Sequence, residues 1–356
     1  MPSDSSPSRA TGRLVEVKTP ARLHLGMLSF GTPSVRSYGG VGVMVDRPGV
    51  HLLMRQAAEF RGRGQLVERA LRFAQECGRA WDLGPQAACE IEVVATPRAH
   101  VGLGSGTQLA LAVAAGMRRL HLAEQGTDVP GPQAGAPEPW HFETREAVSL
   151  ARAVGRGRRS SVGLYGFARG GLIVEAGRFT SPDDRGTDGV RSPMVARVRL
   201  PSAWRCVVIV ERHAEGLSGD AEREAFRRLA PVPREISAEL SRVLLMELLP
   251  AAVEGRFDAF SEAVHAYGQL AGEPFASESS RLPHAEATAQ LIELLGEVGV
   301  VGRAQSSWGP AVMAVCESLA AAGTVVEQFE ALGLTGQFEL SIAKFDSDGA
   351  VLRVLE

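Results

Sequence analysis

The chain has 356 residues, enough for two ordinary domains, and 45% of them are hydrophobic, as in a globular protein with a full core. Its net charge of −3 argues against a chain built as a whole to bind nucleic acid or a membrane surface. The four cysteines are scattered with no CxxC pair, so we expect reduced thiols in a cytosolic protein and no structural zinc site. No run of about 18 apolar residues occurs, which excludes a membrane span.

The N-terminal half predicts both strands and helices. Residues 1–13 are rich in Ser and Pro and lack the apolar core of a secretory signal, so a flexible tail is expected. Pro20 separates two predicted strands, and turn residues at 46–49 predict a hairpin. The predicted elements are strands at 14–18, 22–28, 41–45, 50–55, 89–95 and 171–175, helices at 65–80, 106–121 and 141–154, and a surface loop at 124–140.

The C-terminal half follows a polar break at 180–193, which we interpret as a domain junction. The predicted elements are strands at 195–200, 205–211, 312–316 and 337–343, and helices at 220–229, 235–254, 256–271, 283–298 and 319–332. Strands and helices that mix without strict alternation predict an α+β fold, with domains at 14–180 and 190–356.

A glycine-rich loop at 100–108 is the most informative stretch of the chain. Three glycines within five residues let the backbone turn tightly and leave its N–H groups bare, and a predicted helix begins there. This arrangement is typical of phosphate binding, although a tight turn without a ligand is the alternative. The candidate binding residues of this loop are Gly102, Leu103, Gly104, Gly106, Thr107 and Gln108, with Ser105 as a candidate catalytic residue.

Two other loops, PARLHLG at 20–26 and QSSWGP at 305–310, flank this central loop in the order that is typical of the GHMP kinases, and the chain resembles that superfamily. The resemblance implies a two-domain fold with an N-terminal ribosomal protein S5-like domain and a C-terminal α/β sandwich. It also implies a catalytic Asp at the position that Gly163 takes here. Glycine cannot accept a proton, so the usual kinase base is missing unless an Asp or Glu elsewhere replaces it.

One branch of the superfamily fits these departures better. The stretches HVGLGSGTQLALAVA and SSWGP resemble the beta-ribofuranosylaminobenzene 5'-phosphate synthase family of methanopterin biosynthesis. That resemblance implies condensation of phosphoribosyl pyrophosphate with para-hydroxybenzoate or para-aminobenzoate, release of carbon dioxide and pyrophosphate, a need for Mg²⁺, and a homodimer. An ATP-dependent small-molecule kinase and a non-catalytic ligand-binding relative are the alternatives.

The first loop supplies two further candidate catalytic residues. Arg22 and His24 are two residues apart on a strand, so their side chains share one face. Arg22 could clamp a carboxylate or phosphate, with a surface ion pair as the alternative. His24 could donate to a phosphate or adjust the para substituent of the ring, with a buried structural histidine as the alternative.

Basic, aromatic and acidic residues complete the candidate site. Arg156, Arg158 and Arg159 would draw a ribose phosphate or a benzoate carboxylate, unless they form a solvated basic loop. In the late loop Trp308 could stack on the benzoate ring or belong to the core. The remaining candidates are Ser306, Ser307 and Gly309 for phosphate, and Ser105 with Glu143 or Glu146 for Mg²⁺.

Overall fold

The computed structural model describes residues 13–31, 36–122, 138–157, 160–179, 192–217 and 219–355. Their strands form a nine-stranded sheet and a four-stranded sheet, with helices on both, which confirms the α+β prediction. The larger sheet contains β1 (Leu14–Ser29), β2 (Arg36–Gln56), β3 (Arg61–Gly64), β4 (Cys89–Ala95), β5 (Trp140–His141), β6 (Leu172–Glu175), β7 (Arg178–Phe179), β8 (Met194–Val198) and β13 (Val351–Leu355). The smaller sheet has the order β10 (Arg303–Gln305), β11 (Ala311–Cys316), β9 (Arg205–Glu211), β12 (Phe338–Lys344).

The two longest strands, β1 and β2, are antiparallel partners along most of their length. The predicted break at Pro20 and the predicted hairpin at 46–49 are both wrong. The register shifts between the pairs Thr19–Val50 and Ala21–Val45, so both irregular segments lie opposite each other as a bulge. Because proline has no N–H to donate to the ladder, Pro20 is tolerated at such a bulge without ending the strand.

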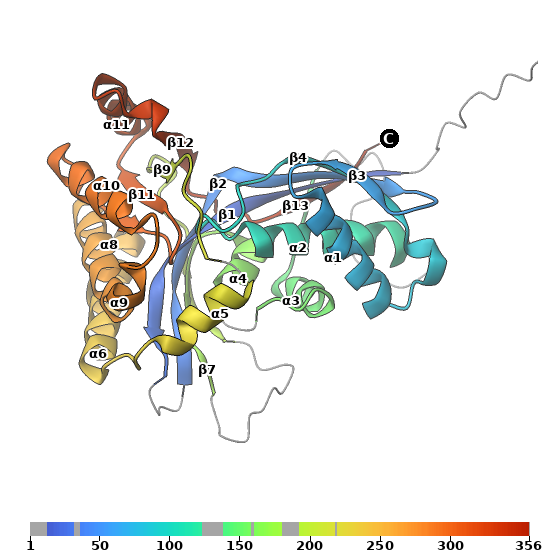
Figure 1. Ribbon diagram of the computed structural model, residues 1–356, viewed down its shortest axis with the longest axis horizontal. Coiled ribbons are helices and arrows are strands. Elements are labelled where there is room, and N and C mark those ends of the chain that lie inside the picture. Colours follow the sequence, from blue (N-terminus) through green and yellow to red (C-terminus); the bar gives the residue numbers. More distant parts are fainter. Residues whose placement is uncertain are drawn as a thin grey trace, which may run out of the picture.

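Helices of the N-terminal half cover one face of the larger sheet (Figure 1). These are α1 (Val67–Ala80), α2 (Ser105–Met117), α3 (Thr144–Ala153) and α4 (Val162–Arg169). The central helix α2 is buried almost all round and consists mostly of small residues, so it can approach the sheet closely. A methyl group on Gly116 would lie 2.3 Å from Met54 Sδ, so a larger residue there would displace the buried Met54 side chain. This packing fixes the start of α2, where the central loop ends.

The C-terminal half adds a helical layer and returns to the first sheet. Its helices are α5 (Gly219–Arg228), α6 (Arg234–Val243), α7 (Leu249–Glu254), α8 (Phe257–Gly272), α9 (Ala276–Ser279), α10 (Ala285–Glu297) and α11 (Leu319–Ala331). One core joins β1 to α8 and the smaller sheet, for example through Leu23, Tyr267 and Val208. Strand β8 pairs with β6, and β13, which was not predicted, pairs with β1. Both ends of segment 190–356 therefore contribute strands to the larger sheet, and Figure 1 places the C-terminus beside it.

Several predictions fall on residues that the structure does not describe. They are the tail to residue 12, most of the 124–140 loop and the 180–191 part of the junction. At the end of that loop Trp140 opens β5, which pairs with β13. None of the described helices is both long enough and apolar enough to cross a membrane.

Candidate functional site

The three predicted loops meet, and Ser306 joins them. Its buried hydroxyl donates to the Gly102 carbonyl at 2.7 Å and accepts from the His24 backbone N–H at 2.9 Å. The Ser307 N–H donates to the His24 carbonyl at 2.8 Å. The sequence predicts that the Ser306 hydroxyl binds a phosphate. The structure uses it to hold the first, central and late loops together, while the Ser307 side chain stays exposed.

Glycines allow the central and late loops to lie in direct contact. Gly102 and Gly104 have φ values of 94° and 67°, in the left-handed region that favours glycine. A methyl group on Gly309 would lie 2.3 Å from the Gly102 nitrogen, so a side chain at either position would separate the loops. The Arg22 N–H donates to the Leu103 carbonyl at 3.0 Å, which fixes the first loop against the same turn.

Helix α2 begins at this junction with its N-terminus toward the loops. The N–H groups of Thr107 and Gln108 both donate to the Gly104 carbonyl, and the N–H groups before them have no partner inside the helix. These groups and the helix dipole favour an anion at this point. The Ser105 hydroxyl is buried and donates to the Arg98 carbonyl at 3.3 Å, so it is directed at the protein.

Arg22 lies between the central loop and the start of α4. An added methyl group at Gly104 would lie 3.2 Å from Arg22 Nε, and one at Gly163 would lie 3.5 Å from Arg22 Cδ. The Gln108 amide donates to the Gly163 carbonyl at 2.8 Å and links α2 to α4. The position expected to carry a kinase base therefore faces Arg22, Thr107 and Gln108, and offers no carboxylate.

A buried polar group lies behind the first loop. His24 Nε2 lies 3.5 Å from the Ser160 hydroxyl, and Glu175 accepts from the Ser161 N–H at 2.7 Å. Burial and the nearby Arg22 charge lower the pKa of His24 to about 3, so its ring is neutral at physiological pH. Burial raises the pKa of Glu175, although hydrogen bonds from Ser160 and its neighbours oppose that shift.

On the other side of His24 lies a small pocket with an aromatic wall. It has a volume of about 130 Å³, and its lining includes His24, Ser307, Trp308 and Phe275. This is smaller than the roughly 300–1,000 Å³ of pockets for drug-sized ligands, so it suits a small ring. Trp308 stacks on Phe226 at 6.0 Å and meets Phe275 edge-on at 5.0 Å. Trp308 is therefore both a wall of the pocket and a member of an aromatic cluster.

His284 holds the late loop from behind. Its ring nitrogens lie 3.2 Å from the Glu215 carbonyl and 3.1 Å from the Trp308 carbonyl, and the side chain is buried. Carbonyl oxygens only accept hydrogen bonds, so each nitrogen faces an acceptor. This contact ties Trp308 to the turn before α10.

Of the three predicted basic residues, the structure describes only Arg156. Arg156 is partly buried, with its guanidinium 4.9 Å from the centre of the Phe73 ring. Burial and the charge of Arg69 lower its pKa. Arg158 and Arg159 lie outside the described residues.

The predicted magnesium ligands, Ser105 and either Glu143 or Glu146, do not lie together. Glu143 caps the start of α3, and Glu146, one turn later, lies 3.6 Å from Arg118, just beyond the far end of α2. Helix α2 has 13 residues, a length of about 20 Å, between Ser105 and that end. Across the described ranges no group of three or more His, Cys, Asp or Glu side chains has the geometry of a metal site. The structure therefore places Glu143 and Glu146 near the opposite end of α2 from Ser105.

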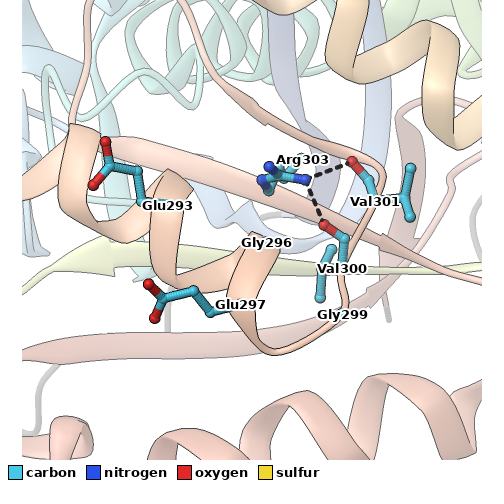
Figure 2. Close-up of a pocket in the computed structure, with 7 residues that line it drawn as sticks. All are labelled: Glu293, Gly296, Glu297, Gly299, Val300, Val301 and Arg303. Carbon is cyan, nitrogen blue, oxygen red and sulfur yellow. Dashed lines mark hydrogen bonds between the residues drawn. The ribbon is translucent and has the colours of Figure 1, made fainter.

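A larger hollow of about 530 Å³ lies elsewhere, at the C-terminal end of α10 (Figure 2). It contains none of the predicted site residues. Arg303 donates to the carbonyls of Val300 and Val301, and Glu293 and Glu297 complete its polar lining (Figure 2). Because the guanidinium is already bonded to the backbone, this hollow is not a better candidate for an anionic substrate.

Sequence reasoning missed Glu175, His284 and Arg69. Glu175 ends a strand that is otherwise apolar and fully buried, and an acidic residue there is a signal that could have been used. His284 and Arg69 lie in ordinary helical contexts, where no local pattern marks them.

Comparisons with known proteins agree with this geometry. A family model described as GHMP kinases C terminal matches residues 248–333. Two solved structures share the fold at a TM-score of 0.61. Homoserine kinase from Cytophaga hutchinsonii is 14% identical, covering 98% of this chain and all of that one. Phosphomevalonate kinase from Streptococcus pneumoniae is 12% identical, covering 94% of this chain and all of that one.

Curated relatives match most of the chain. The beta-ribofuranosylphenol 5'-phosphate synthase of Archaeoglobus fulgidus is 29% identical over 316 residues, or 86% of this chain and 88% of the relative. Its namesake in Methanothermobacter thermautotrophicus is also 29% identical, over 85% of this chain and 88% of the relative. The family match at 248–333 and the two solved structures give the chain the fold of the GHMP kinase superfamily. Within that superfamily its curated relatives are named as synthases, which confirms the branch that the loop sequences resemble.

Proposed function

We propose that the chain condenses phosphoribosyl pyrophosphate with a para-substituted benzoate to form a beta-ribofuranosyl-benzene 5'-phosphate. The observation that carries this proposal is the meeting of two different half-sites at His24. One is the anion-binding turn at the start of α2, and the other is the small pocket beside Trp308. The kinship with synthases over most of the chain supports the same reaction class.

The reaction balances without an oxidant or reductant. The bond from ribose C1 to the diphosphate oxygen breaks, and the diphosphate leaves with its electron pair. The ring carbon that bears the carboxylate attacks C1, and the para substituent supplies electrons to it. The bond to the carboxylate then breaks, carbon dioxide leaves, and the electron pair restores the aromatic ring. The positively charged ring intermediate is itself the electron sink for decarboxylation.

The side chains of this chain have separate roles in that sequence. The N–H groups at the start of α2 hold the diphosphate and stabilise the charge it gains as it leaves. Arg22, between the central loop and α4, binds an anionic group of either substrate. His24 stays neutral because its pKa is lowered to about 3, so it contacts the ring without adding a positive charge beside it.

The names of the relatives bear on the choice of benzoate. Their product carries a phenol, which has a hydroxyl group on the ring. We therefore propose para-hydroxybenzoate ahead of para-aminobenzoate, since it gives that product directly. The requirement for Mg²⁺, the cytosolic location and the homodimer stay predictions.

Carbon dioxide release tests the proposal. The purified chain is incubated with phosphoribosyl pyrophosphate, Mg²⁺ and either benzoate labelled at its carboxyl group, with ATP as a parallel donor. Label released only when phosphoribosyl pyrophosphate is present establishes the synthase and selects its benzoate. No release from either ring, together with ATP turnover on an alcohol, would reject the proposal in favour of a kinase.

A further inference from the structure

Two arginines lie beside the start of α2: Arg156, which the sequence predicted as a binding residue, and Arg69, which it did not. Arg69 projects from α1, and a methyl group on Gly106 would lie only 2.6 Å from its Nη2 atom. The guanidinium therefore lies against the first turn of α2, in space that exists because residue 106 has no side chain. Its Nη1 atom is 3.4 Å from His100 Nε2, in the central loop.

Arg156 approaches the same place from the end of α3. Both guanidinium groups lie near one ring, at 5.9 Å for Arg69 and 4.9 Å for Arg156 from the centre of Phe73. Phe73 is buried, so both cations lie against an apolar floor. Burial lowers the pKa of each arginine, and positive neighbours lower it further.

The charges around this pair do not balance within the described residues. The negative charge of Glu76 acts to raise the pKa of Arg156, and that of Glu222 acts to raise the pKa of His100. No carboxylate in the described ranges lies within 4.0 Å of either guanidinium. Two partly buried cations thus lie beside the positive end of a helix dipole, which is unfavourable unless an anion joins them.

We propose that Arg69, Arg156 and His100 form a diphosphate subsite beside the start of α2, and that the leaving group of the donor occupies it. The identification of that leaving group rests on the proposed function. A diphosphate has two phosphate groups, so one can accept from the N–H groups of α2 while the other accepts from the guanidinium groups. Burial and the charge of Arg69 lower the pKa of His100, so its ring is a neutral hydrogen-bonding group beside the guanidinium groups.

Calorimetric binding of inorganic pyrophosphate to the full chain tests the subsite. Arg69→Gln removes the charge, and we expect about tenfold weaker binding, the loss of one charge-assisted hydrogen bond. Arg79→Gln is the matched control, because Arg79 is exposed in the last turn of the same helix and its loss changes binding by less than about twofold. Arg69→Lys keeps the charge but loses the planar guanidinium, so its affinity for pyrophosphate should lie between those of Arg69→Gln and Arg79→Gln.

Gly106→Ala gives a second, independent variant. The added methyl group displaces the Arg69 guanidinium but leaves its charge, and alanine is favourable in a helix, so folding is retained. We expect weaker pyrophosphate binding here too, with orthophosphate affected less in every variant because it cannot bridge both groups. Thermal melting of each variant confirms that it folds. Pyrophosphate binding that is unchanged in both Arg69→Gln and Gly106→Ala overturns the subsite.

Steady-state kinetics separates this inference from the proposed function. If wild type makes product and Arg69→Gln raises the KM for phosphoribosyl pyrophosphate without changing that for the benzoate, both stand. If wild type makes product and Arg69→Gln has unchanged KM values, the subsite fails and the function stands. If wild type makes no product, yet Arg69→Gln weakens pyrophosphate and ATP alike, the subsite stands for a nucleotide and the proposed function fails.

Discussion

The two sides of the loop junction differ in how far their side chains satisfy one another. The basic flank, made of Arg69, Arg156 and the neutral His100, brings two guanidinium groups together with no described carboxylate in ion-pair distance. The aromatic flank, made of Phe30, Phe226, Phe275 and Trp308, packs ring against ring. An apolar cluster is stable by itself, whereas converging cations are stabilised by an anion. The basic flank is therefore stabilised by a bound anion, whereas the aromatic flank has space for a ligand but is stable without one.

This contrast matches the two substrates of the proposed reaction. The donor carries its charge on phosphates, and its binding would lower the repulsion on the basic flank. The acceptor is a flat ring that needs a small pocket with an apolar wall. His24 and Arg22 lie between the flanks, so changes there should affect both substrates, and changes on one flank should affect one.

The largest expected effect comes from placing a carboxylate where the flanks meet. Gly163→Asp adds a side chain whose Cβ would lie 3.4–3.6 Å from Thr107, Arg22 and Gln108, which is ordinary van der Waals contact. An acidic residue in the first turn of α4 suits the helix dipole, and the fold should be kept. The new carboxylate pairs with Arg22, and we expect kcat/KM to fall about 100- to 1,000-fold, as when a charged binding group is lost.

Gly163→Ala is the matched control for this change. It adds the same first carbon without the charge, and we expect activity within about threefold of wild type. Equal losses in the two variants would mean that space, and not charge, decides the position. A gain of phosphoryl transfer from ATP in Gly163→Asp would show that the kinase chemistry needs only its base restored.

Ser306→Ala should loosen both flanks at once. It removes one bond to the Gly102 carbonyl and one from the His24 N–H, and leaves two buried backbone groups without these partners. We expect the free energy of unfolding to fall by about 3 kcal/mol, and the KM values of both substrates to rise. Chemical denaturation and steady-state kinetics measure the two effects. Ser202→Ala, at an exposed turn before β9, should change neither, and a KM increase confined to one substrate would contradict the role of Ser306 in holding both loops.

His24 should make stability depend on pH. Its pKa is about 3 in the folded chain and 6.5 ordinarily, so between these values the unfolded chain binds the proton and the folded chain does not. Stability is therefore full above pH 6.5 and falls as the pH is lowered, by about 2 kcal/mol at pH 5. Unfolding of His24→Gln at pH 7 and pH 5 should lack this part of the decrease. His213→Gln is the exposed control, and identical pH slopes in all three proteins would disprove the assignment.

Much of this architecture was predictable from local patterns. Strands 89–95 and 205–211 were predicted with the observed bounds, and the three loops could be recognised because turn geometry requires glycine at set positions. The unbroken β1 and β2 were not predictable, because pairing with a common partner overrides the local turn signals at Pro20 and 46–49. The return of β13 to β1 depends on a contact between the two ends of the chain, which no local pattern encodes.

The candidate site divides in the same way. Gly102, Gly104, Arg22 and His24 could be chosen from sequence, because short motifs carry them. The roles of site residues were harder to predict. The Ser306 hydroxyl, for example, is hydrogen-bonded to two loops that lie about 200 and 280 residues away in the sequence. Arg69 is hidden on the polar side of an amphipathic helix, where charged residues are ordinary.

The aromatic flank should show the smallest and most selective effect. Trp308→Leu removes the flat wall of the pocket but keeps an apolar side chain, so we expect the KM for the benzoate to rise about tenfold, at the upper end of an aromatic contact. The KM for phosphoribosyl pyrophosphate should stay unchanged, because the basic flank is untouched. Trp308→Phe keeps a ring and should recover most of the loss. If both KM values rise together, Trp308 acts through the late loop, which His284 and Ser306 hold in place. The aromatic flank would then support the whole junction and would not be a binding wall for one substrate.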